Sequence, residues 1–213
     1  MTIKIEKIEY DDKKLWFTYE LSTGKVLHLS YETYISLGLH QGQTIPSGTY
    51  EYMLEEDERN LARSRAESYA LFQPRTAFEL DRKLQREGIR SEIRQDILAW
   101  LERRGLIDDA RYAVRYAREK SRLKSWSIMK IRAMLRQKGI DHDLILQALD
   151  AIDQGREEAN VVALLEKKYG RRNLTDQKSF DSTYRAMARR GFPPPLVLKV
   201  MKDMREKRVQ DED

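Results

Sequence analysis

Four arginines stand at spacings of four, three and four residues in the most basic stretch of the chain. They are Arg111, Arg115, Arg118 and Arg122, and in a helix these spacings place the side chains in one line, the arginine stripe. Residues 105–140 contain ten Lys or Arg and three acidic residues, so little nearby charge neutralises it. A guanidinium group binds carboxylate or phosphate through a planar fork. The pattern favours a negatively charged partner over a merely solvated helix face.

Further basic residues follow in the next expected helix, where Ile128, Ile131 and Leu135 form the apolar side. The candidate partner-binding residues are Arg111, Arg115, Arg118, Arg122, Lys124, Lys130, Arg132, Arg136 and Lys138. On the first helix, the spacing predicts Tyr112, Ala113, Tyr116 and Leu123 on the core side. Trp126 lies between the two helices, where packing at the junction is expected and stacking on a base or a partner is the alternative.

Signals for catalysis or metal binding are weak. The three histidines, His28, His40 and His142, are scattered, and the chain has no cysteine. Asp108 and Asp109 could be imagined as paired metal ligands, but a carboxylate before a helix is first of all an N-cap. There is also no glycine-rich phosphate loop and no nucleophile-elbow motif. We therefore expect no enzyme activity, no cofactor and no metal.

Composition and charge indicate a folded protein with two kinds of surface. Of 213 residues, 40% are apolar and 35% are charged, and this charged share exceeds the usual quarter or so. No stretch approaches the roughly 20 apolar residues of a membrane span, and the N-terminus lacks the apolar core of a secretory signal. A cytoplasmic monomer is expected. Residues 1–57 carry five basic and ten acidic residues, whereas the remainder carries 35 basic and 25 acidic.

The acidic first segment predicts a small β-meander. Strands are expected around residues 3–10, 15–21 and 26–29, because β-branched and aromatic residues there are separated by turn residues. A short helix at 32–37 should end at Gly38, with a loop around Pro46 and Gly48. Three short strands are marginal alone, so this module is expected to pack on the helices that follow.

Beyond residue 57 the spacing is helical and repeats. Gly88, Gly139 and Gly191 are 51 and 52 residues apart, and apolar residues recur at fixed offsets around each. Four residues before each glycine stand Leu84, Leu135 and Met187, and directly after each stand Ile89, Ile140 and Phe192. The agreement predicts three tandem units of three helices, each capped by a glycine, that stack and share a core.

Local signals give the predicted boundaries of these helices. Thr76 and Glu79 match a capping box, Asp108 or Asp109 and Asp141 can cap two later helices, and Pro193–Pro195 can open the last. In the third unit, Asp181 and Thr183 replace the Met129 and Ile131 of the second, which suggests a terminal repeat with a more polar outer side.

The predicted fold is mainly α, with tandem three-helix repeats stacked into a curved elongated body and a small β-rich N-terminal module. The predicted segments are 1–57, 58–106, 107–154, 155–208 and an acidic tail, 209–213.

Three short motifs stand out, namely GLIDDARYA at 105–113, LRQKGI at 135–140, and ELDRKL at 79–84 followed by Gly88. They resemble motifs of the RecX family, bacterial regulators of the RecA recombinase. GLIDDARYA at 105–113 is similar to a signature of that family, and LRQKGI at 135–140 looks like its second-repeat element. ELDRKL at 79–84, followed by Gly88, resembles its first repeat. The resemblance covers roughly residues 60–205, and the N-terminal meander resembles the extension of longer members.

This resemblance implies a non-enzymatic protein that binds RecA, mainly as the filament on single-stranded DNA. It also implies inhibition of strand exchange, ATP hydrolysis and co-protease activity, and hence an influence on recombination, DNA repair and the SOS response. Two alternatives remain open from the residues: a direct DNA-binding protein without a recombinase partner, and a hydrolase acting on nucleic acid. Weak direct DNA binding is compatible with the RecA-binding regulator that the resemblance implies.

Overall fold

The N-terminal module is an antiparallel sheet that carries one short helix. In the computed structural model, which describes residues 2–170 and 174–212, the strand order is β3-β2-β1-β4. The strands are β1 (Ile3–Asp11), β2 (Trp16–Leu21), β3 (Val26–Ser30) and β4 (Thr44–Ile45). The three predicted strands are confirmed, and β4 adds a two-residue edge beside β1. Helix α1 (Tyr31–Leu37) ends at Gly38, as predicted.

One long helix, α2 (Ser47–Phe72), connects the sheet to the helical repeats. The predicted loop around Pro46 and Gly48 is wrong at its C-terminal side, because the helix already begins at Ser47. Pro46 stands just before the first turn, where its fixed φ and missing N–H are tolerated. Burial of Met53 against the sheet then outweighs the low helix propensity of Gly48. The helix runs through the boundary predicted between residues 57 and 58.

The two ends of α2 belong to two different cores. Met53 packs with the inner side chains of the sheet, whereas Ala62 and Ala66 pack in the first helical repeat. Between them, Asp57 Oδ1 accepts hydrogen bonds from the backbone N–H of His28 (2.7 Å) and lies 3.0 Å from its Nδ1. Asn60 Nδ2 also donates to His28 O (3.1 Å). The expected packing of the meander on the helices is therefore achieved by one continuous helix.

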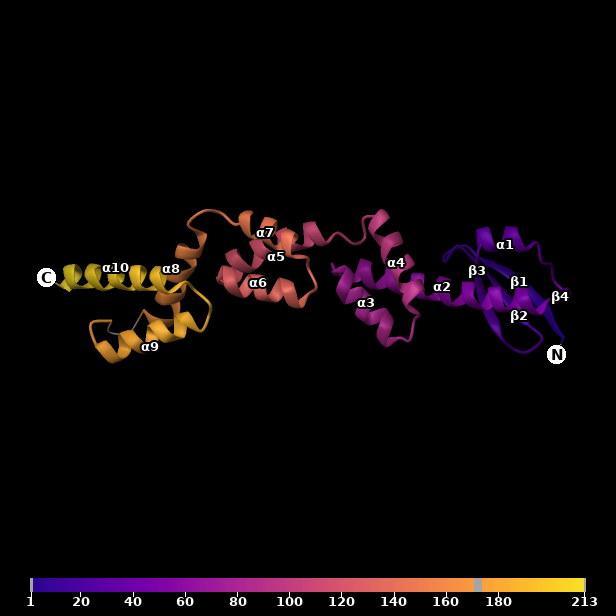
Figure 1. The fold of residues 1–213 in the computed structure, drawn as a ribbon, viewed down its shortest axis with the longest axis horizontal. Coiled ribbons are helices and arrows are strands. Elements are labelled where there is room, and N and C mark those ends of the chain that lie inside the picture. The colour runs from indigo at the N-terminus through magenta and orange to yellow at the C-terminus, as the bar shows by residue number, and fades with distance from the viewer. Residues whose placement is uncertain (1, 171–173, 213) are drawn as a thin grey trace. The chain divides into compact units, whose positions relative to one another are not determined.

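The rest of the described chain is helical, in the repeating order that the glycines predict (Figure 1). The helices are α3 (Ala77–Arg86), α4 (Ser91–Arg103), α5 (Asp109–Lys124), α6 (Ile128–Gln137), α7 (His142–Asp150), α8 (Arg156–Tyr169), α9 (Gln177–Ala188) and α10 (Pro194–Glu212). Gly88, Gly139 and Gly191 separate the second and third helices of each repeat with φ between +74° and +81°. Only glycine adopts that conformation without strain, which explains the spacing.

Each repeat has its own hydrophobic core, so the expected shared core is wrong. Leu84, Leu135 and Met187 are each at most 1% exposed, and each lies in a separate cluster. Three helices of 9 to 26 residues already enclose eight or more buried apolar side chains per repeat. The chain divides into two compact units, Met1–Ile107 and Asp108–Asp213. The finer division at residues 106/107 and 154/155 stays a prediction.

Inside the second unit, polar groups connect the second and third repeats. Ser127 Oγ donates to Arg190 O (2.6 Å), and Glu157 Oε1 accepts from the N–H of Ile128 (2.9 Å). Asn160 Nδ2 donates to Ser121 Oγ (3.1 Å) and to Trp126 O (3.4 Å). Asn160, Ser121 and Ser127 are nearly inaccessible to solvent. Hydrogen bonds of this kind fix a single relative placement of the two repeats within this unit.

The polar replacement at Thr183 lies inside the third repeat, and not on its outer side. Thr183 is fully buried, as Ile131 is at the matching position of the second repeat, while Asp181 is exposed like Met129. The predicted acidic tail continues α10 as far as Glu212, but its side chains and residues 171–173 lie outside the described residues. Among the described helices, none is both long and apolar enough to cross a membrane.

Candidate partner-binding surface

The helix that carries the arginine stripe starts and ends with well-formed caps. Asp108 is the N-cap of α5, and its Oδ1 accepts a hydrogen bond from the N–H of Arg111 at 2.8 Å. This role confirms the expected cap and accounts for Asp108 without a metal. Within residues 2–170 and 174–212, no three His, Cys, Asp or Glu side chains gather as a metal site would require. At the other end, Ser125 takes a left-handed conformation with φ 48°.

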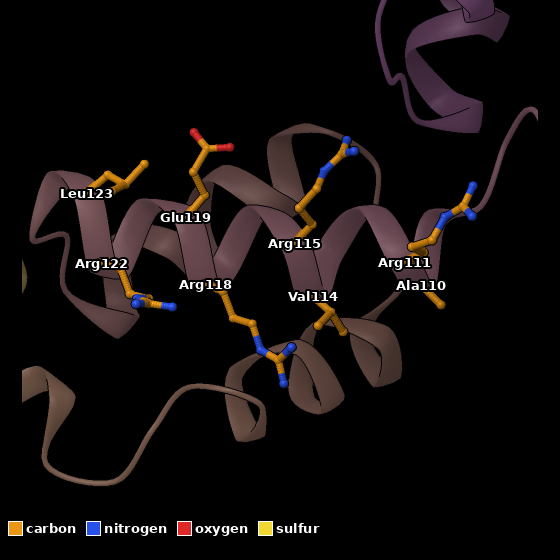
Figure 2. Close-up of a pocket in the computed structure, with 8 residues that line it drawn as sticks. All are labelled: Ala110, Arg111, Val114, Arg115, Arg118, Glu119, Arg122 and Leu123. Carbon is orange, nitrogen blue, oxygen red and sulfur yellow. The ribbon is translucent and has the colours of Figure 1, made fainter.

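The buried face of α5 consists of small residues. Ala113, Ala117 and Ser121 are each at most 2% exposed. The two alanines pack in the core with α6 and α7, and Ser121 faces Asn160 of α8. Small side chains let the neighbouring helices approach closely, which leaves the long side chains of α5 on the opposite side. Figure 2 shows Arg111, Arg115, Arg118 and Arg122 projecting outward along this helix. All four are exposed, so the stripe forms the outer face of α5, as predicted.

Internal contacts neutralise the arginine stripe only slightly. Arg111 Nε lies 3.7 Å from Asp108 Oδ2, and this exposed pair contributes at most about 1 kcal/mol. Arg118 Nε donates to the carbonyl oxygen of Ala151 at 3.1 Å, which orients the side chain and leaves its charge in place. Neither Arg115 nor Arg122 forms an ion pair within 4 Å with any residue that the structure describes. The stripe thus presents strong donors to solvent.

The carboxylate of Glu119, which lies beside the stripe, is itself neutralised. Glu119 lines the same shallow hollow as the arginines (Figure 2), and its Oε1 lies 2.7 Å from Lys120 Nζ. The hydrogen bond from Lys120 holds the pKa of Glu119 below its usual value, helped by the charges of Arg115 and Lys124. Glu119 therefore stays charged and paired with a lysine, so it competes weakly with an external anion for the arginines.

Other predicted site residues lie on or beside α6, several of them against aromatic rings. Lys130 Nζ lies 3.9 Å from the centre of the Trp126 ring, and Lys138 Nζ lies 5.4 Å from that of Tyr112. Arg115, at 6.0 Å from the Tyr112 ring, links this group to the stripe. Lys124 and Arg136 are exposed, while Arg132 is half-buried.

The aromatic side chains of this repeat are structural, as expected. Tyr112 and Tyr116 are half-buried against the core of the repeat, and their ring centres are 5.9 Å apart. Burial raises the pKa of Tyr116 above its usual value. Trp126 packs edge-on against Tyr116 at 6.4 Å, which confirms its role at the helix junction. Lys120 Nζ lies 5.1 Å from the centre of the Tyr116 ring, a contact that the i,i+4 spacing in α5 could have indicated. The contacts of Lys130 and Lys138 with the rings come from α6 and its C-cap, and the sequence reading missed them.

Leu123 is the one predicted core residue of α5 that the structure places outside. Its side chain is 73% exposed and lines the hollow beside Arg122 (Figure 2). The predicted core position was therefore wrong. A helical wheel gives the direction of a side chain around the axis, but it does not show whether a neighbouring helix reaches that turn.

The helices that form this surface match a known protein family. The family model for the second three-helix domain of RecX matches residues 108–149, which include α5, α6 and nearly all of α7. A regulatory protein RecX of Mycobacterium avium is 30% identical over 158 residues, covering 73% of this chain and 89% of the relative. The regulatory protein RecX of Amycolatopsis mediterranei is 31% identical over 130 residues, which cover 61% of this chain and 74% of that relative. The chain belongs to the RecX family.

The RecX fold extends over almost the whole chain. A crystal structure of a regulatory protein RecX matches with a TM-score of 0.77 at 27% identity, covering 94% of this chain and 99% of the other. The fold similarity therefore includes the N-terminal unit as well as the repeats. Both relatives carry the name of regulatory proteins.

Proposed function

We propose that this RecX-family protein is a non-enzymatic regulator of the RecA recombinase in the cytoplasm. It binds RecA, as a monomer and mainly on the filament that RecA forms on single-stranded DNA. Binding inhibits strand exchange, ATP hydrolysis and co-protease activity, and so modulates recombination, DNA repair and the SOS response. Family membership supports the regulatory role, since the relatives are named regulatory proteins.

The observation that carries the binding part is the exposed arginine stripe on α5. From Arg111 to Arg122 the helix rises about 16 Å, so the four guanidinium groups can contact an extended negatively charged surface at several points. Arginine forks bind carboxylates and phosphates through paired hydrogen bonds, and a nucleoprotein filament offers both groups. Contacts at several points on one polymer raise the overall affinity through effective concentration.

The inner side of α5 holds the stripe in place. The carbonyl oxygen of Arg122 accepts a hydrogen bond from Arg156 of α8 at 3.2 Å, and Ser121 is bonded to Asn160. Both contacts come from the third repeat, so the C-terminal half of α5 is fixed by two repeats. Because a preorganised surface loses less entropy on binding, the third repeat supports the affinity even where it does not touch the partner.

Charge reversal of the stripe tests this proposal. The variant in which Arg111, Arg115, Arg118 and Arg122 are all changed to Glu should lose at least about tenfold in affinity for filaments, since each charge-assisted contact is worth about 1.5–3 kcal/mol. Co-sedimentation with RecA filaments measures the affinity, and circular dichroism checks the fold. Because Arg118 also bonds to Ala151, the Arg115→Glu/Arg122→Glu pair is the milder second variant.

A matched control reverses four exposed cations elsewhere, namely Lys25, Arg65, Lys167 and Lys178. This control changes the net charge of the protein by the same amount and should keep most of the binding. If the folded stripe variants restrain strand exchange as well as the wild type does, α5 is not the binding surface.

The same preparations separate the alternative functions. A direct DNA-binding protein would bind naked DNA tightly, with log affinity falling steeply against log salt. Weak binding to naked DNA beside strong binding to the RecA-coated strand rules that alternative out. Degradation of DNA or RNA by the pure protein with a divalent metal would instead identify a hydrolase and contradict the non-enzymatic role.

A further inference from the structure

A basic pocket lies within the first unit, away from the arginine stripe. The turn between β1 and β2, one face of α2 and the end of α4 enclose about 590 Å³. This volume falls inside the range of roughly 300–1,000 Å³ that small-molecule sites occupy. Four cations line the pocket against one carboxylate, namely Lys13, Lys14, Arg63 and Arg104 against Glu67.

The positive charge of this pocket contrasts with its surroundings. Residues 1–57 contain only five lysines and ten acidic residues, yet two of those lysines, Lys13 and Lys14, line the pocket. Glu67 lies 3.7 Å from Arg104 in a half-exposed pair, so it offsets one charge and leaves three. Arg63 Nε is shielded from solvent and has no hydrogen-bond acceptor among the described residues.

The turn that carries the two lysines is held in a defined conformation. Asp11 Oδ1 accepts hydrogen bonds from the N–H groups of Lys13 (3.0 Å) and Lys14 (3.1 Å), and Asp11 O accepts from Leu15 N (2.8 Å). Leu15 has a φ of 58°, which is unfavourable for a leucine, and its side chain is 66% exposed. Burial therefore does not compensate for the strain. Strain of this kind concentrates at functional sites, and Leu15 lines the pocket together with both lysines.

Flat cationic and aromatic groups also line the pocket. The guanidinium groups of Arg63 and Arg104 lie 5.0 Å and 4.7 Å from the ring centre of Trp100. Guanidinium planes and aromatic rings are surfaces on which nucleobases stack, whereas lysines bind phosphate as point charges. An extended acidic peptide would need a groove instead of a pocket of this size, and a lone phosphate would leave most of it unfilled.

We propose that this pocket binds a nucleoside phosphate, with the phosphate at Lys13 and Lys14 and the base against Arg104 and Trp100. Two ligands can supply a nucleoside phosphate to the pocket: a free mononucleotide, or the phosphorylated end of a single DNA strand. The ligand gives the N-terminal module a role of its own, since the module supplies both phosphate-binding lysines. This inference does not depend on the arginine stripe, which lies in the other unit.

Isothermal titration calorimetry on the full-length protein tests it. The titrants are dAMP, deoxyadenosine, inorganic phosphate, a 5′-phosphorylated dT octamer and an octaglutamate peptide. We expect saturable binding of dAMP, of the phosphorylated octamer, or of both, and at least about tenfold weaker binding of deoxyadenosine and of phosphate. The stronger of the two nucleotide titrants identifies the source of the ligand.

Single substitutions locate the binding. Lys14→Ala, an exposed change that leaves the core intact, and Arg63→Ala should each weaken nucleotide binding by about tenfold or more. Arg65→Ala is the matched control, because Arg65 is on the same helix but lies outside the pocket and pairs with Glu87 at 3.9 Å. The stripe variant with four Arg→Glu changes should bind the nucleotide as the wild type does, so this proposal and the proposed regulatory function can fail separately.

Three results would overturn the proposal. The first is no saturation by either nucleotide titrant up to about 10 mM, where binding is too weak to be specific. The second is phosphate or octaglutamate binding as tightly as the nucleotides, which would make the pocket a general anion site. The third is equal loss of binding in the Arg65 control and in the pocket variants.

Discussion

Removal of the Asn160 carboxamide tests whether polar contacts hold the second and third repeats together. Asn160 is 2% exposed, and its Nδ2 donates to Ser121 Oγ at 3.1 Å and to Trp126 O at 3.4 Å. In Asn160→Ala, the buried Ser121 hydroxyl loses its partner, which costs about 1–3 kcal/mol. The longer bond to Trp126 adds less, so we expect about 2–3 kcal/mol in total.

Urea unfolding followed by Trp126 fluorescence measures this loss. Replacing Trp16 and Trp100 by Phe leaves Trp126 as the only fluorescent indole, so the signal reports on the second unit. With a urea slope of about 1.5 kcal/mol per molar, the midpoint should fall by about 1.3–2 M. The matched control, Gln147→Ala, truncates an exposed carboxamide of α7 and should change stability by no more than about 0.5 kcal/mol.

A double-mutant cycle assigns the effect to the Asn160–Ser121 bond. Ser121→Ala alone should cost about 1 kcal/mol or more, and the double variant should lose less than the sum of the two single variants by about 1 kcal/mol. A loss below about 0.5 kcal/mol in Asn160→Ala, or strict additivity in the cycle, would refute the view that this buried hydrogen bond fixes the interface between the repeats.

Two further predictions concern strained or buried groups. Ser125→Gly should raise the free energy of unfolding of the second unit by about 0.5–1 kcal/mol, because Ser125 has a φ of 48° that glycine adopts freely; an unchanged or lower urea midpoint would contradict it. Tyr19 is fully buried, and burial raises its pKa to about 12, above the value of about 10 in the unfolded chain. Unfolding therefore releases a proton between pH 10 and 12, and stability falls there by up to about 1.4 kcal/mol per pH unit. Tyr19→Phe should remove this component, and parallel stability curves for variant and wild type from pH 9 to 11 would show the reasoning to be wrong.

Features that depend on neighbours in sequence were predictable. The Thr76–Glu79 capping box and the Asp108 cap follow from hydrogen bonds within four residues, and the repeat follows from glycines that only a left-handed φ explains. The exposed side of α5 was also predictable, since the spacing of its arginines and alanines fixes opposite faces of one helix.

Features that depend on distant segments were not predictable. Helix α2 begins at Ser47 because Met53 is buried beneath a sheet whose strands lie earlier in the chain. Thr183 lies inside its repeat although its polarity suggested the outside. The basic pocket combines residues from the β1–β2 turn, α2 and α4, separated by some 50 and 40 positions in the sequence. No local pattern connects such residues, because only the tertiary fold brings them together.

The separate cores of the second and third repeats have a consequence for the binding surface. Hydrophobic burial stabilises each repeat by itself, so it does little to set the angle between them. That angle depends on directional hydrogen bonds, and two of these end on Ser121 and Arg122, at the C-terminal half of α5. The outer side of the same turns carries the end of the arginine stripe. A partner that binds the stripe and the third repeat together would therefore act on the hydrogen bonds between the repeats. Because these bonds are directional, such a partner would meet the two repeats at one fixed angle.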